Sequence, residues 1–165
     1  MMENLSSTAA ASEEGLSLNL PMKRAGFYNI LTLQRRGMGE RSKMKHNPGF
    51  LKLVNEARAG VKECTVAEAK TRLDRGDIQH FLDVREDTEY AKDHAKGARH
   101  LGKGIIERDV ETYIPNKDEA ILLYCGGGYR SILAADALQR MGYSNVVSMD
   151  GGIKGWRDAG YPIER

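Results

Sequence analysis

Short apolar segments separated by amphipathic ones constrain the fold of this chain more than any other feature. The stretch "AILLYC" at 120–125 is almost wholly apolar, and "IQHFLDVR" at 78–85 is mostly apolar until it ends in charged residues. "NVVSM" at 145–149 is a third such stretch. Strands that are apolar on both faces are typical of a parallel sheet buried under helices. We therefore predict three buried strands at these positions.

Segments with helical periodicity lie before, between and after these strands. Thr65 and Glu68 have the spacing of a capping box, and Gly142 stands where a helix C-cap is expected. The alternation of strands and helices predicts an α/β fold, with a small central parallel sheet flanked by helices. The predicted helical segments are 47–60, 65–77, 86–98, 105–114, 129–142 and 152–160.

The charge of the chain is concentrated near its N-terminus. Residues 1–43 carry six Lys or Arg against four Asp or Glu, so they hold the whole net charge of +2. We predict a disordered basic arm at 1–46 and a folded domain at 47–165. A targeting or anionic-surface role for the arm, and a start of translation at Met44 instead of Met1, are alternatives that the sequence leaves open.

Composition excludes several classes of protein. The predicted domain has no excess of basic residues, so nucleic acid is a poor candidate partner. No run of 18 apolar residues predicts a membrane span, and no apolar segment near the N-terminus suggests a secretory signal. Two cysteines are too few for a disulfide scaffold or a structural zinc site. We expect a cytoplasmic protein without metal or cofactor.

The loop "YCGGGYRS" at 124–131 is the strongest candidate for chemistry. Three glycines between a strand and a helix let backbone N–H groups converge into an anion nest, and the start of the helix adds its positive end. A thiolate at Cys125 would be stabilised there. Arg130 would add a fixed charge and a forked donor for an anionic reactant. Asp83 and Arg85 end the neighbouring strand, at the sheet edge where ligands usually bind.

A simpler interpretation is that the glycines form an ordinary turn and that Cys125 is a small buried residue. The spacing alone leaves both interpretations open. A Walker-type phosphate loop is excluded because no "GK[ST]" follows the glycines. The second cysteine, Cys64, precedes a predicted helix cap. It is either an inert thiol or a partner that could resolve a persulfide on Cys125 as a disulfide.

Three stretches resemble the signatures of the rhodanese family, single-domain type. "CGGGYRS" is similar to the family's active-site loop, and "FLDVREDTEYAKDHAKGARHL" resembles its upstream signature. "MGYSNVVSMDGGIKGWRDAGYPIE" resembles the C-terminal signature. The resemblance covers residues 61–165 and implies a thiosulfate sulfurtransferase. Such an enzyme moves a sulfane sulfur from thiosulfate, a persulfide or a polysulfide to cyanide or a thiol, or to a sulfur-accepting protein.

The resemblance also implies roles for individual residues. Cys125 would form the persulfide, and Arg130 would bind the sulfite-like leaving group. Asp83 and Arg85 would organise the pocket without transferring protons. The expected substrate-binding residues are Gly126, Gly127, Gly128, Tyr129, Arg130 and Ser131.

Two other classes of protein remain as alternatives. Phosphatases and arsenate reductases use a thiolate with an arginine, but related phosphatases have a longer loop that accommodates a tetrahedral phosphate. A non-catalytic sulfur carrier or interaction module is the other alternative. The uncharged glycines predict that this chain uses thiosulfate poorly and prefers a persulfide or polysulfide donor.

Overall fold

A computed structural model describes residues 46–165, and the predicted arm at 1–46 lies outside this part except for His46. The three apolar stretches form adjacent parallel strands, with β5 paired to β6 on one side and to β2 on the other. Two shorter strands extend the sheet, whose order is β1-β6-β5-β2-β4. These strands are β1 (Lys62–Cys64), β2 (His80–Asp83), β4 (Arg99–His100), β5 (Ile121–Tyr124) and β6 (Val146–Met149).

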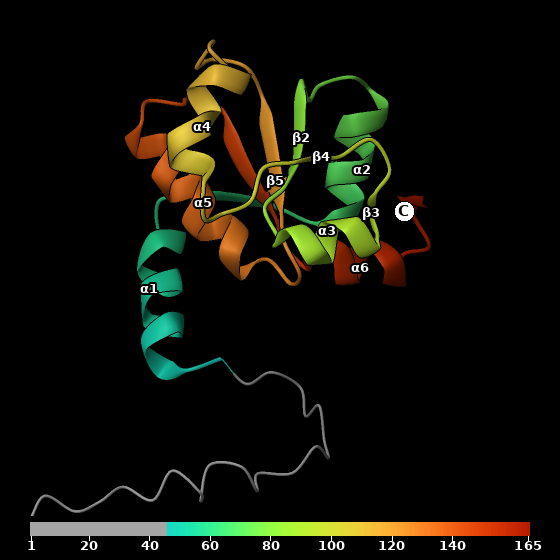
Figure 1. Ribbon diagram of the computed structural model, residues 1–165, viewed down its shortest axis with the longest axis horizontal. Helices are drawn as coiled ribbons and strands as arrows, with labels where there is room; N and C mark the ends of the chain where they lie inside the picture. Colours follow the sequence, from blue (N-terminus) through green and yellow to red (C-terminus); the bar gives the residue numbers. More distant parts are fainter. Residues whose placement is uncertain (1–45) are drawn as a thin grey trace, which may run out of the picture. The chain divides into compact units, whose positions relative to one another are not determined.

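Helices cover both faces of this sheet (Figure 1). Residues of α1, α4 and α5 pack on one face, and residues of α2 and α6 pack on the other. A separate antiparallel pair joins β3 (His94–Ala95) to β7 (Ile163–Glu164). The helices are α1 (Pro48–Arg58), α2 (Val66–Asp74), α3 (Asp87–Lys92), α4 (Ile106–Tyr113), α5 (Tyr129–Arg140) and α6 (Gly152–Asp158).

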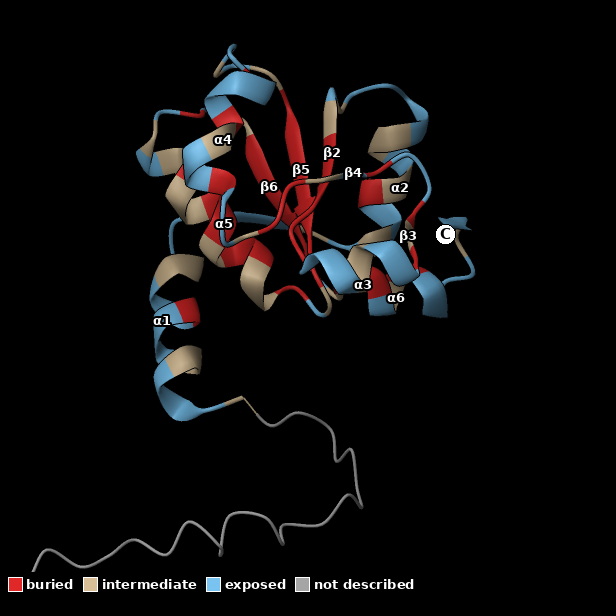
Figure 2. Ribbon diagram, viewed as in Figure 1, coloured by how far each residue is buried: buried red, intermediate tan, exposed pale blue. Residues whose placement is uncertain are grey.

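The central strands are buried on both faces (Figure 2). Along β5, Leu123 faces the core formed with α1, α4 and α5, whereas Leu122 and Tyr124 face the core formed with α2 and α6. Trp156 lies in the second core, where its ring centroid is 5.7 Å from that of Phe81. The strands are apolar on both faces because helices cover both faces of the sheet. The predicted α/β fold is confirmed.

The helix limits follow the local sequence signals closely. The capping box of α2 is present, because the Glu68 N–H donates to Thr65 Oγ1 (3.2 Å) and the Thr65 N–H donates to Glu68 Oε2 (2.7 Å). Gly142 follows α5 with a φ of +96°, as expected for a residue after a helix C-cap.

The prediction for 86–98 is only partly correct. The helix in this stretch ends at Lys92, and Asp93 continues with extended backbone into β3. Asp93 is fixed there by tertiary contacts, because its carbonyl accepts from Arg85 and its carboxylate pairs with Arg157. The short strands β1, β3, β4 and β7 were not predicted. No helix within 46–165 is both long and apolar enough to span a membrane.

Candidate active site

Cys125 directly follows β5 and opens the turn into α5. Its thiol is almost completely buried, in the core that α5 and α1 share. The turn ends at Gly128, the residue before α5, whose φ of +98° lies in the left-handed region. This conformation favours glycine because a Cβ would be strained there. The sulfur therefore lies beneath a tight turn that leads into the first turn of a helix.

Two hydrogen-bond donors contact the sulfur within this turn. The Gly128 N–H lies 3.2 Å from Cys125 Sγ. Ser131 Oγ lies 3.7 Å from the same sulfur and also 3.0 Å from the Gly128 carbonyl oxygen. Behind Ser131, the hydroxyl of Ser148 on β6 donates to Ser131 Oγ at 2.8 Å. Both serines are fully buried, so these hydroxyl groups form a short polar chain inside an apolar core.

The start of α6 holds the turn from the other side. The Ile153 N–H donates to the Cys125 carbonyl (2.8 Å), and the Lys154 N–H donates to the Gly126 carbonyl (3.3 Å). Gly152 makes this approach possible, since a Cβ there would lie 2.2 Å from the Cys125 carbonyl oxygen. Gly152 therefore belongs to the site, although it was not predicted as a site residue.

This contact fixes the direction of the amides in the loop. In a trans peptide the carbonyl and the next N–H point in opposite directions. Because the Cys125 and Gly126 carbonyls point toward α6, the N–H groups of Gly126 and Gly127 point away from it. Neither N–H has a backbone or side-chain acceptor among residues 46–165. The loop thus presents unpartnered donors, which is the property that an anion nest requires.

Arg130 is not a free cation. Its guanidinium binds both carboxylate oxygens of Glu89 on α3, with Nη1 2.6 Å from Oε2 and Nη2 3.0 Å from Oε1. Glu86 Oε1 lies 3.4 Å from Nη1. The hydrogen bond to Glu89 raises the pKa of Arg130, and in return it lowers the pKa of Glu89. These two glutamates were not predicted as site residues, and only their placement on α3 reveals them.

The guanidinium also lies close to the loop. A Cβ built on Gly126 would be 3.3 Å from Arg130 Nη2. Glycine at this position therefore leaves room for the arginine beside the first loop peptide. Arg130 lies in the first turn of α5, next to the loop that Cys125 opens, and it already has two anionic partners.

Asp83 and Arg85 form a buried ion pair at the end of β2. Arg85 Nε lies 3.0 and 2.9 Å from the two Asp83 oxygens, and Arg85 Nη2 lies 2.6 Å from Oδ2. The guanidinium also donates to the Asp93 carbonyl just after α3. The pair therefore fixes the C-terminal end of the helix that carries Glu89. The pair makes no hydrogen bond to Cys125, but the Arg85 guanidinium lies 5.9 Å from the ring centroid of Tyr124, the residue directly before that cysteine, so any effect on the pocket is indirect.

Two further predicted residues have clear positions. The Tyr129 ring packs against Phe50 on α1 and against His46, two residues before that helix, with centroid distances of 6.3 Å and 4.5 Å. Its side chain is therefore directed toward α1. Cys64 ends β1, and burial raises the pKa of its thiol to about 11. A thiol that resists ionisation is a poor nucleophile, which favours the inert interpretation of Cys64.

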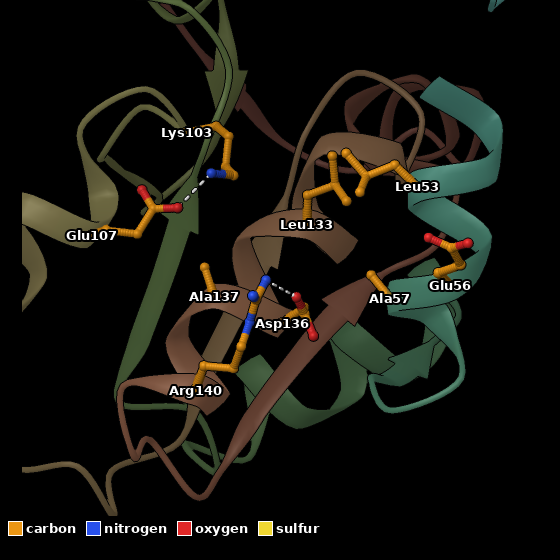
Figure 3. A pocket seen from close by; sticks show the side chains of 9 residues that line it. All are labelled: Leu53, Glu56, Ala57, Lys103, Glu107, Leu133, Asp136, Ala137 and Arg140. Carbon is orange, nitrogen blue, oxygen red and sulfur yellow. Dashed lines mark hydrogen bonds and ion pairs between the residues drawn. The ribbon is translucent and has the colours of Figure 1, made fainter. Parts of the chain in front are cut away.

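A hollow of about 460 Å³ lies elsewhere, between α1, α5 and the start of α4 (Figure 3). Leu53, Ala57 and Leu133 give it apolar walls, while Lys103 pairs with Glu107 at its rim (2.6 Å). None of the predicted site residues lines it. This hollow is therefore separate from the chemistry expected at Cys125.

Comparisons with known proteins place this geometry in a family. Residues 65–159 match the model of the rhodanese-like domain. A thiosulfate sulfurtransferase of Haemophilus influenzae is 35% identical over 103 residues, which is 62% of this chain and 94% of the relative. A Bacillus subtilis protein named as a candidate sulfur carrier is 28% identical over 102 residues, 62% of this chain and only 54% of that protein's length.

A solved structure extends the similarity to most of the described part. It comes from a Rhodopseudomonas palustris protein of unknown function, described as a candidate tyrosine phosphatase. The TM-score is 0.62 with 28% identity, covering 76% of this chain and all of the other. The names of the relatives thus include sulfur transfer, sulfur carriage and phosphatase activity on one fold.

Proposed function

The chain belongs to the rhodanese-like domain family, and on that premise we propose that it is a sulfurtransferase that carries sulfur as a persulfide on Cys125. The observation that supports this most directly is the loop around the thiol. The Gly128 N–H already contacts Sγ at 3.2 Å, and the amides of Gly126 and Gly127 are directed away from α6 without acceptors among residues 46–165. Such donors stabilise both a thiolate and an anionic persulfide.

The proposed reaction has two displacement steps. In the first, the Cys125 thiolate attacks the outer sulfur of the donor, so that a new S–S bond forms and the donor's S–S bond breaks. The electron pair leaves with sulfite when thiosulfate is the donor, or with a thiolate when a persulfide is the donor. In the second, cyanide or an acceptor thiol attacks the outer sulfur and releases the Cys125 thiolate. No external oxidant or reductant is consumed.

The other predicted residues have supporting roles in this proposal. The amides from Gly126 to Arg130 would hold the transferred sulfur, and Ser131 Oγ would add a hydroxyl donor to Sγ. Arg130 would orient the donor from the edge of the loop. Asp83 and Arg85 would keep α3 in place, so that Glu89 in turn fixes the arginine.

Intact mass spectrometry tests the proposal directly. We expect the wild-type protein to gain about 32 Da, the mass of one sulfur, after incubation with thiosulfate or a polysulfide, and to lose it on addition of cyanide. Cys125→Ser should gain nothing. Absence of any gain from both donors would contradict the proposal, and turnover of an aryl phosphate in its place would favour the phosphatase alternative.

A gain of sulfur that cyanide and thiols fail to remove would instead indicate a carrier. The protein would then deliver its sulfur only to a specific partner. The rate of cyanide-dependent loss therefore distinguishes an enzyme from a carrier module, both of which need an intact Cys125.

A further inference from the structure

Three carboxylates lie close to the Cys125 loop or to the arginine beside it. Arg130 lies next to the first loop peptide, since its Nη2 would be 3.3 Å from a Cβ built on Gly126. The carboxylates are Glu86, the residue before α3, Glu89 on α3, and Asp150, whose Oδ1 would lie 3.2 Å from a Cβ on Gly128. The guanidinium beside the loop is therefore already paired with carboxylates, at a site expected to receive an anion.

The pairing of Arg130 determines what the arginine can still do. Glu89 occupies the edge formed by Nη1 and Nη2, and Glu86 lies beside Nη1. Within 46–165, Nε has no hydrogen-bond acceptor, so the edge formed by Nε and Nη2 remains available. Arg130 can thus donate hydrogen bonds to a ligand, but the two glutamates offset its charge.

We propose that Glu86 and Glu89 make this site select a hydropersulfide of low net charge over the thiosulfate dianion. The inference rests on the proposed function and specifies the donor for it. A dianion approaching Arg130 meets the two carboxylates that already pair with it, and its sulfite leaving group develops charge beside Glu89. A thiol hydropersulfide has at most one negative charge on its sulfurs and releases a thiolate that a proton can neutralise.

The loop itself is suited to this donor. Gly126 and Gly127 add no cationic side chain, so these two residues offer only their backbone amides to the sulfur. These amides stabilise a small anion that they contact, but they attract an anionic donor only weakly from a distance. Glu86 and Glu89 are therefore the determinants that a substitution can test, and Glu86 is the better choice because its side chain is exposed.

The experiment measures the second-order rate constant for the gain of one sulfur on Cys125, by intact mass in a single turnover without acceptor. The donors are thiosulfate and cysteine hydropersulfide, whose ammonium and carboxylate groups cancel. The variants are Glu86→Gln and the matched control Asp87→Asn. Asp87 is the first residue of α3 and directly follows Glu86, and its side chain is 94% exposed without an ion pair to Arg130, so the control makes the same charge change.

We expect Glu86→Gln to raise the rate constant with thiosulfate by about three- to tenfold at low salt, since one repulsive unit charge is removed. The rate constant with the hydropersulfide should change less than about twofold, and Asp87→Asn should change neither rate constant by more than that. In the wild type, added KCl should accelerate the reaction with thiosulfate, because salt screens repulsion. A site that attracts the dianion would show the opposite dependence.

Two results would overturn this inference while leaving the proposed function intact. One is a wild-type thiosulfate reaction that slows as salt is added. The other is an equal increase of the thiosulfate rate constant in Glu86→Gln and Asp87→Asn. Failure of the wild-type protein to gain sulfur from either donor would instead overturn the proposed function itself.

Discussion

Gly152 offers the sharpest test of how the loop is built. Its φ is +52°, and a Cβ added to it would lie 2.2 Å from the Cys125 carbonyl oxygen. The same Cβ would lie 2.9 Å from both the carbonyl carbon of Gly126 and the nitrogen of Gly127. Because all three contacts are with backbone, no side chain can rotate to relieve them. Gly152→Ala must therefore displace either the loop or the start of α6.

The size of the effect can be worked out by comparison with Gly160. Gly160 also has a positive φ, +70°, but a Cβ there would meet nothing within 4 Å. Gly160→Ala should therefore cost only the left-handed backbone strain, about 1–2 kcal/mol of unfolding free energy. Gly152→Ala should cost that strain and the overpacking of a filled site, which is typically about 1–3 kcal/mol more. We expect roughly 2–5 kcal/mol in total for this variant.

Urea unfolding and the gain of sulfur on Cys125 are the two measurements. Gly160→Ala should form the persulfide at the wild-type rate, whereas Gly152→Ala should lose most of that rate while it is still folded. The loss of rate in a folded protein is expected because a displaced loop no longer directs the amides of Gly126 and Gly127 away from α6. Equal unfolding free energies for the two variants, with unchanged sulfur gain in both, would refute the proposed bracing of the loop by α6.

Three other predictions follow from the polar contacts of the site. Glu89→Gln should lower the free energy of unfolding at pH 7 by roughly 0.5–1 kcal/mol. Since the pKa of Glu89 is lowered from 4.5, this difference between variant and wild type should shrink as the pH falls below 4.5, and a pH-independent difference would contradict the ion pair. With a pKa of about 11, Cys64 should alkylate at pH 8 at about a thousandth of its full thiolate rate, and rapid alkylation would disprove the protection of this thiol by burial. Cys64→Ser should leave the sulfur gain on Cys125 unchanged. Ser148→Ala should lower the free energy of unfolding by about 1 kcal/mol and slow persulfide formation, because it removes the hydroxyl that donates to Ser131. Ser144 is exposed, so Ser144→Ala should change neither quantity.

Much of the fold could be predicted because its elements carry strong local signals. The apolar strand at 120–125 and the amphipathic helix that follows it fix where Cys125 lies, since a residue after a buried parallel strand stands at the ligand-binding edge. The capping box at Thr65 likewise fixes the start of α2. In these places the secondary structure that a few neighbouring residues favour is the one that the tertiary structure contains.

The missed elements depend on contacts between distant parts of the chain. The strand β4 has only two residues, Arg99 and His100, and exists because they pair with Leu82 and Asp83. The early end of α3 depends on Asp93, which Arg85 and Arg157 hold from other elements. No local periodicity encodes such pairings, so a single sequence gives little indication of them.

The same distinction explains why Arg130 was predicted as a site residue without its partners. Its place five residues after Cys125 is visible in the sequence, and the structure puts it in the first turn of α5. The extent to which its charge is offset depends on Glu89, which is 41 residues away on a helix whose C-terminal end Arg85 contacts. A thiolate loop alone is compatible with sulfur transfer, sulfur carriage or phosphatase chemistry. If the chain transfers sulfur as proposed, the carboxylates paired with Arg130 favour a hydropersulfide over thiosulfate, because they offset the charge that would attract a doubly charged donor.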